Sequence, residues 1–386
     1  MPLRSVICSA LAVGAIGLAA PAAANAAFTV VPSPNAFTGN NDLNGVGASS
    51  ASDAWAVGTL AGAFEDSAIG TLTEHFNGTA WTLVPSPDRI HIDDELNAVA
   101  DLSPTNAWAV GLVKGAGTKT GSPLIVQWDG LSWQTVAAPA GVSGVLRAIS
   151  ADSASDIWAV GDDGRGHAIA FRFGGTSWST TPLPAAGVDK LAGVKAFGPN
   201  DVWAVGTQIT TAAPQTRTLI MHWDGSAWSI VPSANPNPNT DSLRAIDGTS
   251  SHDLWAVGQQ ATSETITGAG PGSRTLTEHF NGTRWTAVAS PSTGDDDSLN
   301  GVAAVSPTAI STVGSFEDRT GSIPVDRTLA EQFTGTSWSI VPSVNVGTTD
   351  NLLTGAARIP GTTGVWAVGF HLTATGPDQT VIERGS

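Results

Sequence analysis

The sequence predicts an all-β protein, a seven-bladed β-propeller, on three observations. A unit recurs seven times along the chain at intervals of 45 to 56 residues. Each unit contains four short runs rich in Val, Ile, Thr, Phe and Trp, bounded by Gly, Asn, Asp and Pro, which is typical of strands joined by turns. The two ends of the chain carry complementary parts of one unit, as a closed ring requires.

Each unit has the same four segments, one for each expected strand. The first begins with a Leu, and the second reads Asp-x-Trp-Ala-Val-Gly. The third is Thr-Leu-x-x-His followed by Phe or Trp, and the fourth is Trp-x-x-Val-Pro-Ser-Pro. The leading leucines are Leu43, Leu96, Leu146, Leu191, Leu243, Leu299 and Leu353. Four strands per unit at this period predict one propeller blade per unit.

The seventh unit ends near Glu383 without a fourth segment. The missing segment lies at the other end of the chain, where residues 28–34 match residues 81–87 almost residue for residue. We therefore expect the N-terminal strand to serve as the outer strand of the last blade, so that residues 27–386 form a single seven-bladed domain.

Residues 1–26 have the pattern of a secretory signal peptide. Arg4 precedes an apolar stretch, and Ala24-Asn25-Ala26 provides a small-residue cleavage site. The apolar stretch is shorter than a membrane-spanning helix requires, and no later one is long enough. The sequence therefore predicts a secreted, extracellular protein with no membrane span after the signal is removed. Cys8, the only cysteine, lies in this segment, which excludes a disulfide or thiol chemistry in the mature chain.

The composition narrows the possible partners. The chain of 386 residues has 17 basic and 33 acidic residues and a formal net charge of −16. Such a chain would repel a phosphate backbone, which argues against nucleic-acid binding. Prolines near the end of the expected outer strands, such as Pro32 and Pro85, remove donors that would recruit another strand. We therefore expect an acidic monomer.

One face of the disc is expected to carry the variable loops. The distance from the Gly of Trp-Ala-Val-Gly to the aromatic residue of the third segment ranges from 12 to 22 residues in the first six units. The other spacings within the unit are nearly constant. The connection between the second and third strands and the connection between blades open on the same face. That loop-rich face is the usual location of function on a rigid scaffold.

Polar residues follow the leading leucines of the inner strands. We expect five of them to ring the mouth of the axial channel on the loop-rich face and to bind a ligand there: Asn44, Asn97, Arg147, Arg244 and Asn300. Asn and Arg side chains suit hydrogen bonding to a polar or anionic ligand such as a sugar. The alternative is a channel filled only with water.

Two further groups of acidic residues could be catalytic acids or Ca²⁺ ligands. If the protein is an enzyme, Asp101 and Asp247 are the nearest acids to the channel, which is a sparse set for glycoside chemistry. No catalytic residue is otherwise assigned. Candidate Ca²⁺ ligands are Asp93, Asp94, Asp295, Asp296 and Asp297. No established calcium-binding spacing is present, so the preferred interpretation is solvated acidic loops with no cofactor and no metal.

Other residues recur at one position of the unit. For His75, His222 and His279 we expect hydrogen bonds between blades. For Glu74, Glu278, Glu331 and Glu383 we expect pairing with Arg or Thr of the neighbouring blade. For Asp53, Asp156, Asp201 and Asp253 we expect bonds to backbone N–H groups of a turn.

The Asp-x-Trp-Ala-Val-Gly, His-Trp-Asp-Gly and Val-Pro-Ser-Pro elements resemble the Trp-rich propeller repeats of secreted bacterial proteins, a group that is compared with kelch and galactose-oxidase propellers. The resemblance covers residues 28–384 and implies the fold more than an activity. The copper and tyrosyl-radical site of galactose oxidase is excluded, because the chain has no Tyr and no Cys after residue 8.

These observations together predict a secreted, non-catalytic propeller that binds an extracellular polysaccharide or protein on its loop-rich face. The alternative is an extracellular glycan hydrolase or lyase that acts at the channel mouth. A structural role in the cell envelope is a third possibility.

Overall fold

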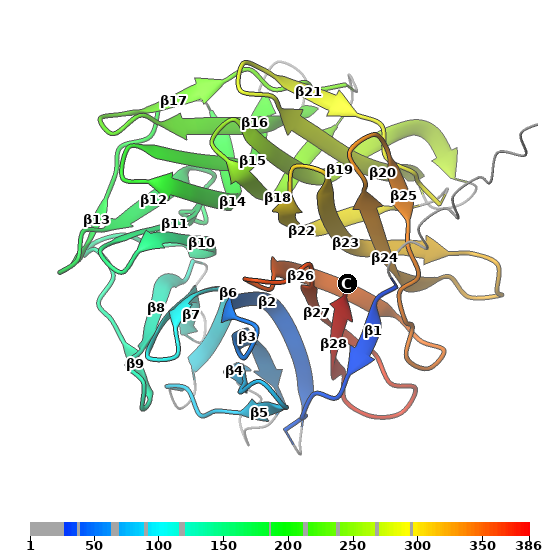
Figure 1. The fold of residues 1–386 in the computed structure, drawn as a ribbon, viewed down its shortest axis with the longest axis horizontal. Coiled ribbons are helices and arrows are strands. Elements are labelled where there is room, and N and C mark those ends of the chain that lie inside the picture. The colour runs from blue at the N-terminus through cyan, green and yellow to red at the C-terminus, as the bar shows by residue number, and fades with distance from the viewer. Residues whose placement is uncertain are drawn as a thin grey trace, which may run out of the picture.

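Seven four-stranded sheets are arranged in a ring around a common axis (Figure 1). The computed structural model describes residues 27–36, 39–62, 69–88, 92–115, 120–184, 187–210, 215–236, 240–266, 270–293 and 296–386. Within these residues all regular structure is β-strand. The first strand of each sheet lies nearest the axis, and the inner strands contact one another around the ring. The prediction of a seven-bladed propeller is therefore confirmed.

The blades follow one another in chain order, each built from an inner strand outward. Blades one and two are β2 (Asn40–Ser50), β3 (Asp53–Ala61), β4 (Ile69–Phe76), β5 (Trp81–Leu83), and β6 (Ile92–Ser103), β7 (Asn106–Gly115), β8 (Ser122–Trp128), β9 (Trp133–Thr135). Blades three and four are β10 (Val145–Ser153), β11 (Asp156–Asp162), β12 (Ala168–Phe173), β13 (Trp178–Thr180), and β14 (Val188–Gly198), β15 (Asp201–Thr210), β16 (Gln215–Trp223), β17 (Trp228–Val231). Blades five and six are β18 (Asp241–Ser250), β19 (Asp253–Ile266), β20 (Gly270–Phe280), β21 (Trp285–Val288), and β22 (Ser298–Ser306), β23 (Ala309–Asp318), β24 (Val325–Phe333), β25 (Trp338–Ile340).

Blade seven combines both ends of the chain. It consists of β26 (Asn351–Arg358), β27 (Val365–His371), β28 (Gln379–Gly385) and β1 (Thr29–Val31). Strand β1 pairs antiparallel with β28, as Figure 1 shows where the blue and red strands lie side by side. This confirms that the N-terminal strand closes the ring. The predicted signal peptide, residues 1–26, lies outside the described residues. No helix in the described part of the chain has the length and apolar character of a membrane span.

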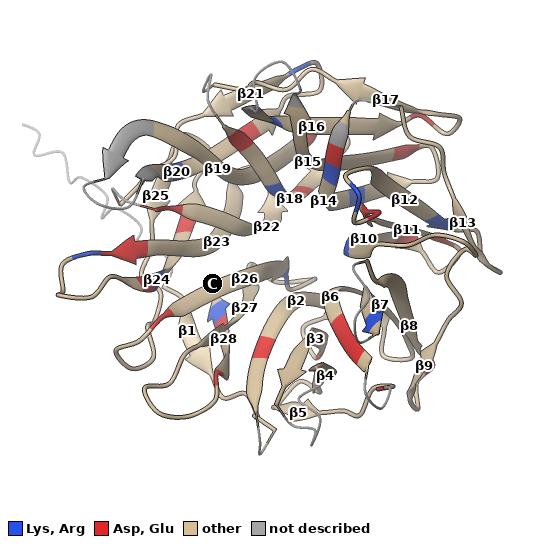
Figure 2. Ribbon diagram, turned by 180° about the vertical axis from the view of Figure 1, so that it is seen from behind, with Lys and Arg blue, Asp and Glu red and all other residues tan. Residues whose placement is uncertain are grey.

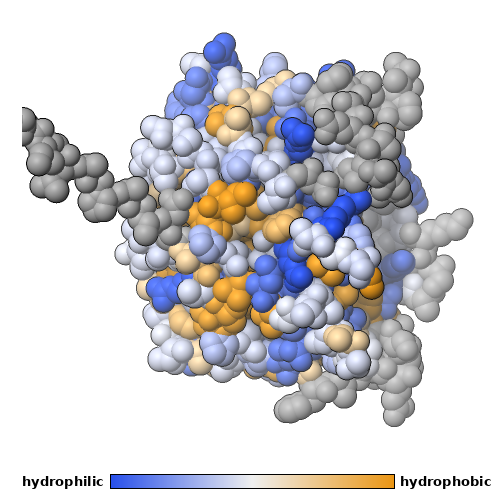
Figure 3. Space-filling model, turned by 90° about the vertical axis from the view of Figure 1, so that its right-hand side faces the viewer, coloured by the Kyte–Doolittle hydropathy of each residue, from blue (hydrophilic) through white to orange (hydrophobic). Residues whose placement is uncertain are grey.

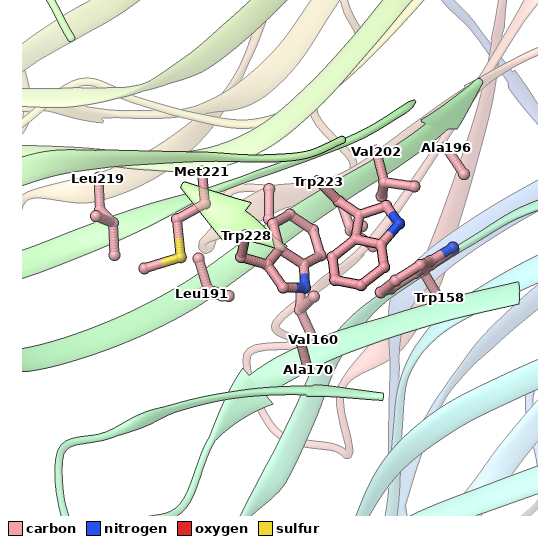
Figure 4. Packing of buried hydrophobic residues seen from close by; sticks show 12 residues of the cluster. Trp158, Val160, Ala170, Leu191, Ala196, Val202, Leu219, Met221, Trp223 and Trp228 are labelled. Atoms are coloured by element: carbon pink, nitrogen blue, oxygen red, sulfur yellow. The ribbon is translucent and has the colours of Figure 1, made fainter. Parts of the chain in front are cut away.

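Tryptophans fill the spaces between blades. Trp158 on β11 contacts Trp223 and Trp228 of the next blade, with ring centroids 5.2 and 5.5 Å apart (Figure 4). Equivalent three-ring clusters occur at five other blade junctions, centred on Trp55, Trp108, Trp203, Trp255 and Trp366. Each aromatic pair adds roughly 0.5–1.5 kcal/mol beyond the area that it buries. The repeated Trp residues therefore make the blades a single packed unit.

The junction between blades six and seven is built differently. Ser311 stands where the other blades have the central Trp, and Gly385 stands where they have the aromatic residue of the third strand. Phe28, which is buried, takes the place of the outer-strand Trp, and its N–H donates to the Pro342 carbonyl at 2.8 Å. A Cβ atom at Gly385 would lie 2.8 Å from the Phe28 ring. One ring thus fills the space that three rings fill elsewhere, at the junction where the chain ends meet.

Each inner strand contains a β-bulge directly after its leading Leu. In blade one the register shifts between Leu43 and Gly45, and the same shift follows the leading Leu of the other six blades. The Gly of Trp-Ala-Val-Gly lies opposite this bulge. A Cβ atom at Gly58 would approach the Asp42 carbonyl oxygen to 1.8 Å, so no side chain fits there. In several blades the extra residue of the bulge is directed toward the neighbouring blade, as Asn44 is toward the Leu96 carbonyl.

The histidines that recur on the third strand bond within their own blade, so the expectation of bonds between blades was wrong. The Nε2 atom of each lies 2.7 to 2.9 Å from a carboxylate oxygen of the Asp that precedes the Trp: His75 to Asp53, His222 to Asp201, His279 to Asp253. The register pairs Trp55 with His75, which brings the Asp beside the imidazole. These Asp residues therefore accept side-chain bonds rather than the turn N–H bonds that were expected; in blade three Arg172 takes the place of the His.

The recurring glutamates are buried between blades, as expected, but most of their bonds are to Ser rather than to Arg or Thr. The Ser33 Oγ donates to Glu74 at 2.9 Å, and the Ser343 Oγ donates to Glu383 at 3.0 Å. Glu278 accepts bonds from Ser233 and from the N–H of the next residue. Neither carboxyl oxygen of Glu331 has a hydrogen-bond partner among the described residues. Burial raises the pKa of all four carboxyls.

The rim of the disc is formed by the short outer strands. Two residues after the buried aromatic of the outer segment, four blades have an exposed aliphatic residue: Val30, Leu83, Ile230 and Ile340. Figure 3 shows apolar patches separated by hydrophilic side chains on one side of this rim. Short strands with interspersed polar residues limit edge-to-edge pairing. The monomeric state remains a prediction.

Candidate functional site

The axial channel has two mouths of different character, separated by a ring of aliphatic side chains. Along each inner strand, from the loop-rich face to the face of the tight turns, the bulge residue comes first and the aliphatic residue second. The aliphatic ring consists of Val46, Val99, Ile149, Val194, Ile246, Val302 and Ala356. Charged residues then follow on several strands, near the turn-side mouth.

At the loop-rich mouth, the predicted asparagines connect neighbouring blades. The Nδ2 atoms of Asn44, Asn97 and Asn300 donate to the carbonyl of the leading Leu of the next blade at 2.8, 2.9 and 2.8 Å. The Thr354 hydroxyl makes the same bond from blade seven to Leu43 of blade one. Since each amide N–H₂ already serves a main-chain acceptor, these residues hold the ring together at this mouth.

The two predicted arginines lie at the same mouth and also have protein partners. The Arg147 Nε donates to Asp162 of its own blade at 2.8 Å. The Arg244 guanidinium donates to Asn300 and to Gln259, at 2.5 and 2.6 Å. Both side chains remain exposed. The structure thus brings the five predicted ligand residues to one mouth, where their polar groups are largely occupied.

Most of the described candidate Ca²⁺ ligands bond to the protein at or directly before the start of an inner strand. The Asp93 carboxylate accepts the Ile69 N–H, and that of Asp296 accepts the Ser273 N–H at 2.9 Å, in each case from the preceding blade. Asp297, which is fully buried, accepts the N–H of a Thr in its own loop at 2.7 Å.

Asp94 and Asp297 occupy a position that holds Asn in two other blades. There Asn41 and Asn351 also accept a loop N–H, at 2.8 and 2.7 Å. Because a neutral amide accepts the same kind of hydrogen bond, the acid at this position is explained without a metal ion. Asp295 lies outside the described residues. Within the described ranges, no group of three or more His, Cys, Asp or Glu is placed to hold a metal ion.

The turn-side mouth contains a cavity of about 380 Å³ on the axis. Its floor is formed by six members of the aliphatic ring, and its walls include the small residues Gly47, Ala48, Ala100 and Ala357. A second hollow of about 460 Å³ shares Ala151, Asp152, Lys195 and Arg358 with it, so the two adjoin. The cavity therefore has aliphatic side chains at its base, while most of the surface that it exposes is polar.

Charged side chains stand around this cavity. Lys195 Nζ lies 2.6 Å from Asp247 Oδ1, and Asp247 Oδ2 accepts the Ala304 N–H at 2.8 Å. Asp152 and Arg358 are exposed, and neither has a hydrogen-bond or ion-pair partner within the described part of the chain. Figure 2 shows basic residues on inner strands around the axis, among them β14.

Asp101 lines the same cavity but is held in place from one side. Its Oδ2 accepts the Ser49 N–H at 2.9 Å, while its Oδ1 is buried and has no hydrogen-bond partner in the described ranges. Burial, followed by the nearby charge of Asp53, raises the pKa of Asp101 to about 8. Asp101 is therefore neutral at pH 7.

The structure brings together two acids that the sequence had singled out, Asp101 and Asp247, with three residues that sequence reasoning missed. Those three are Asp152, Lys195 and Arg358. A detectable pattern existed for two of them, because Lys195 and Arg358 follow the leading Leu by four and five residues, where most other blades have Gly or Ala. Asp152 follows by six residues, at a position that holds no Gly or Ala in any blade, so no such signal marked it. Charged departures from these two small-residue positions mark the cavity better than the polar bulge residues do.

No protein-family model matches the sequence, and no curated protein matches it. Solved structures with the same fold include YCF48 bound to a D1 peptide, with a TM-score of 0.53, 14% identity, and coverage of 92% of this chain and 94% of that one. YCF48 from Cyanidioschyzon merolae has a TM-score of 0.51 and 14% identity over 92% and 98%. A PL25 ulvan lyase bound to -[GlcA(1-4)Rha3S]- has a TM-score of 0.53 and 11% identity over 90% and 94%. At these identities the similarity shows the fold alone.

Proposed function

We propose that the protein is a secreted recognition module that binds an extracellular polysaccharide or protein, without turnover, in the turn-side cavity of its axial channel. The observation that carries this proposal is the cavity of about 380 Å³ with two unpaired charges at its rim, Asp152 and Arg358. Binding pockets typically combine an apolar surface with a few convergent polar groups. Secretion rests on the pattern of residues 1–26.

The loop-rich face is less suited to this role than the sequence suggested. Its asparagines and Arg244 use their donors to connect blades, so a ligand would compete with the bonds that hold the ring. Asp152 and Arg358, the charged residues at the turn-side rim, form no such bonds within the described part of the chain. Solved propellers of this fold include one bound to a peptide and one lyase bound to a polysaccharide, which keeps both ligand classes in view.

Catalysis is the second candidate, and one observation favours it. Asp101 is a neutral acid and Asp247 forms an ion pair with Lys195 in the same cavity, and glycosidases use pairs of carboxyl groups with different environments. Against it, the Oδ1 of Asp101 is buried, and Asp247 is held by Lys195 and a backbone N–H. A ligand could not reach either acid without displacing these contacts.

The test is to take the protein that an expressing culture releases into its medium and to screen it against glycan, cell-wall polysaccharide and peptide panels. The N-terminal sequence of the released protein checks cleavage after Ala26. Binding without product, lost in Asp152→Asn or Arg358→Gln and retained in the loop-rich variant Arg147→Gln, would support the proposal. Product release that Asp101→Asn and Asp247→Asn abolish would establish the enzyme instead.

A chelator arm of the same screen addresses Ca²⁺. The expected result is unchanged binding, because protein hydrogen bonds account for Asp93, Asp296 and Asp297. Loss of binding on chelation would make the acidic loops metal sites.

A further inference from the structure

The two unpaired charges at the turn-side cavity face each other across the axis. Asp152 lies on β10 of blade three, and Arg358 ends β26 of blade seven. The inner strands contact their neighbours in ring order, so these blades are three steps apart, the greatest separation in a seven-membered ring. A ligand that spans the cavity therefore meets an anion at one end and a cation at the other.

The remaining charges of the cavity do not alter this polarity. Lys195 and Asp247 neutralise each other at 2.6 Å, and Lys195 also lies 5.7 Å from the centre of the Phe197 ring. Asp101 is neutral at pH 7, because its pKa is raised to about 8. The electrostatic field at the mouth is thus set by Asp152 and Arg358, in a protein whose net charge is −16.

The surface between the two charges is mostly polar, although aliphatic side chains lie at its base. The cavity floor is formed by Val46, Ile149, Val194, Ile246, Val302 and Ala356, and the walls include Ser150, Asp101, Lys195 and Asp247 beside five Gly and Ala residues. A volume of about 380 Å³ falls within the range of roughly 300–1,000 Å³ that small-ligand pockets occupy. A matching ligand therefore carries polar groups between its charged ends, and a peptide main chain supplies them, because each unit has one donor and one acceptor.

We propose that the cavity binds a short peptide with free termini, its carboxylate at Arg358, its ammonium group at Asp152 and its main chain against the polar lining between them. This deepens the proposed function, on which it rests, by naming the ligand class. An Arg side chain suits a carboxylate because it can donate two parallel hydrogen bonds. An acidic glycan has no positive group to bind Asp152, and its negative charge would be repelled by a protein whose net charge is −16.

The probe is the tripeptide alanyl-valyl-alanine, compared by calorimetry at pH 7 with its N-acetylated and its C-amidated forms. The expected result is that blocking either terminus weakens binding about tenfold or more, the loss of one charge-assisted contact. Arg358→Gln should weaken binding of the free tripeptide by a similar factor, and this variant should bind the free and the C-amidated forms equally. Asp152→Asn should likewise weaken binding of the free tripeptide and should bind the free and the N-acetylated forms equally.

Two control variants sharpen the interpretation. Exchange of the charges, Arg358→Asp with Asp152→Arg, should restore binding of the free tripeptide, because the zwitterion can turn around. Arg147→Gln at the opposite mouth should change nothing. Unchanged melting temperatures would show that the exposed substitutions leave the fold intact.

Equal affinity for the free and blocked tripeptides, or affinity that neither rim variant changes, would overturn the inference. If a glycan binds instead and depends on Arg358, recognition in this cavity stands and only the peptide assignment falls. If neither ligand class binds, both proposals fail together.

Discussion

Glu331 is a buried carboxyl whose proton should control the pH dependence of stability. It lies on β24 with no exposed surface, and neither oxygen has a hydrogen-bond partner among the described residues. Burial, followed by the charge of Asp297, raises its pKa from 4.5 to about 8. The unfolded chain therefore releases this proton near pH 4.5, while the folded chain keeps it up to about pH 8.

The sign and size of the effect follow from this gap. Between pH 4.5 and about 8 the folded state binds more protons than the unfolded state, so the free energy of unfolding falls as the pH rises. The full gap corresponds to a loss on the order of 5 kcal/mol, treated as an upper bound. Below pH 4.5 the contribution is constant, and above pH 8 no further stability is lost.

The perturbation is Glu331→Met. Met221 holds the same position in blade four and is fully buried there, so the fold accommodates this side chain. Relative to the wild type, the variant should gain a few kcal/mol at pH 8 and much less at pH 4.5, since it has no proton to lose. Urea unfolding followed by Trp fluorescence at pH 4.5, 6, 7 and 8 gives the free energies.

Glu383→Met is the matched control. It should flatten the pH dependence in the same direction, because burial also raises the pKa of Glu383. It also removes the acceptor of the Ser343 hydroxyl and of the Val344 N–H, which should cost about 1–3 kcal/mol at every pH. If Glu331→Met leaves the pH slope of the wild type unchanged, Glu331 is not protonated in the folded state and the reasoning is refuted.

Three further predictions concern the blade architecture and the cavity. Gly58→Ala should destabilise the fold by at least about 3 kcal/mol, because its Cβ would lie 1.8 Å from a carbonyl oxygen, whereas Gly174→Ala, with no atom within 4 Å of its Cβ, should cost little in the same thermal melts. Asn97→Ala should lower the free energy of unfolding by about 1 kcal/mol through loss of its bond to the next blade. A loss of ligand affinity with unchanged stability would instead make Asn97 a binding residue. Asp101→Asn should reduce the decrease in the free energy of unfolding that the wild type shows as the pH rises from 3.8 to about 8, because an Asn side chain has no proton to release. Unfolding at pH 5, 7 and 9 measures this decrease. If the variant shows the same pH dependence as the wild type, the Asp101 carboxyl is not protonated in the folded state.

The sequence by itself determined the number of blades, the four strands of each and the closure of the ring. Short repeated sequence motifs predict these properties: the Trp-Ala-Val-Gly strand, the turn residues and the half-unit at residues 28–34 that pairs with β28. Strand and turn formation depend on neighbouring residues, and the chain repeats the same strand and turn motifs seven times. The role of Ser311 became clear only at the closure junction, where Phe28 fills the space left by the missing rings.

Only the tertiary structure decided which side chains meet. A bulge after the leading Leu turns Asn44 toward the next blade. The strand register pairs His75 with Trp55, which places the imidazole beside Asp53 of the same blade. A shift of one residue would reverse either outcome. Asp152 and Arg358 are far apart in the chain and line one cavity only because seven blades close around one axis. Local pattern sets the strands, but contacts across the ring depend on register and closure, which no single unit of the repeat contains.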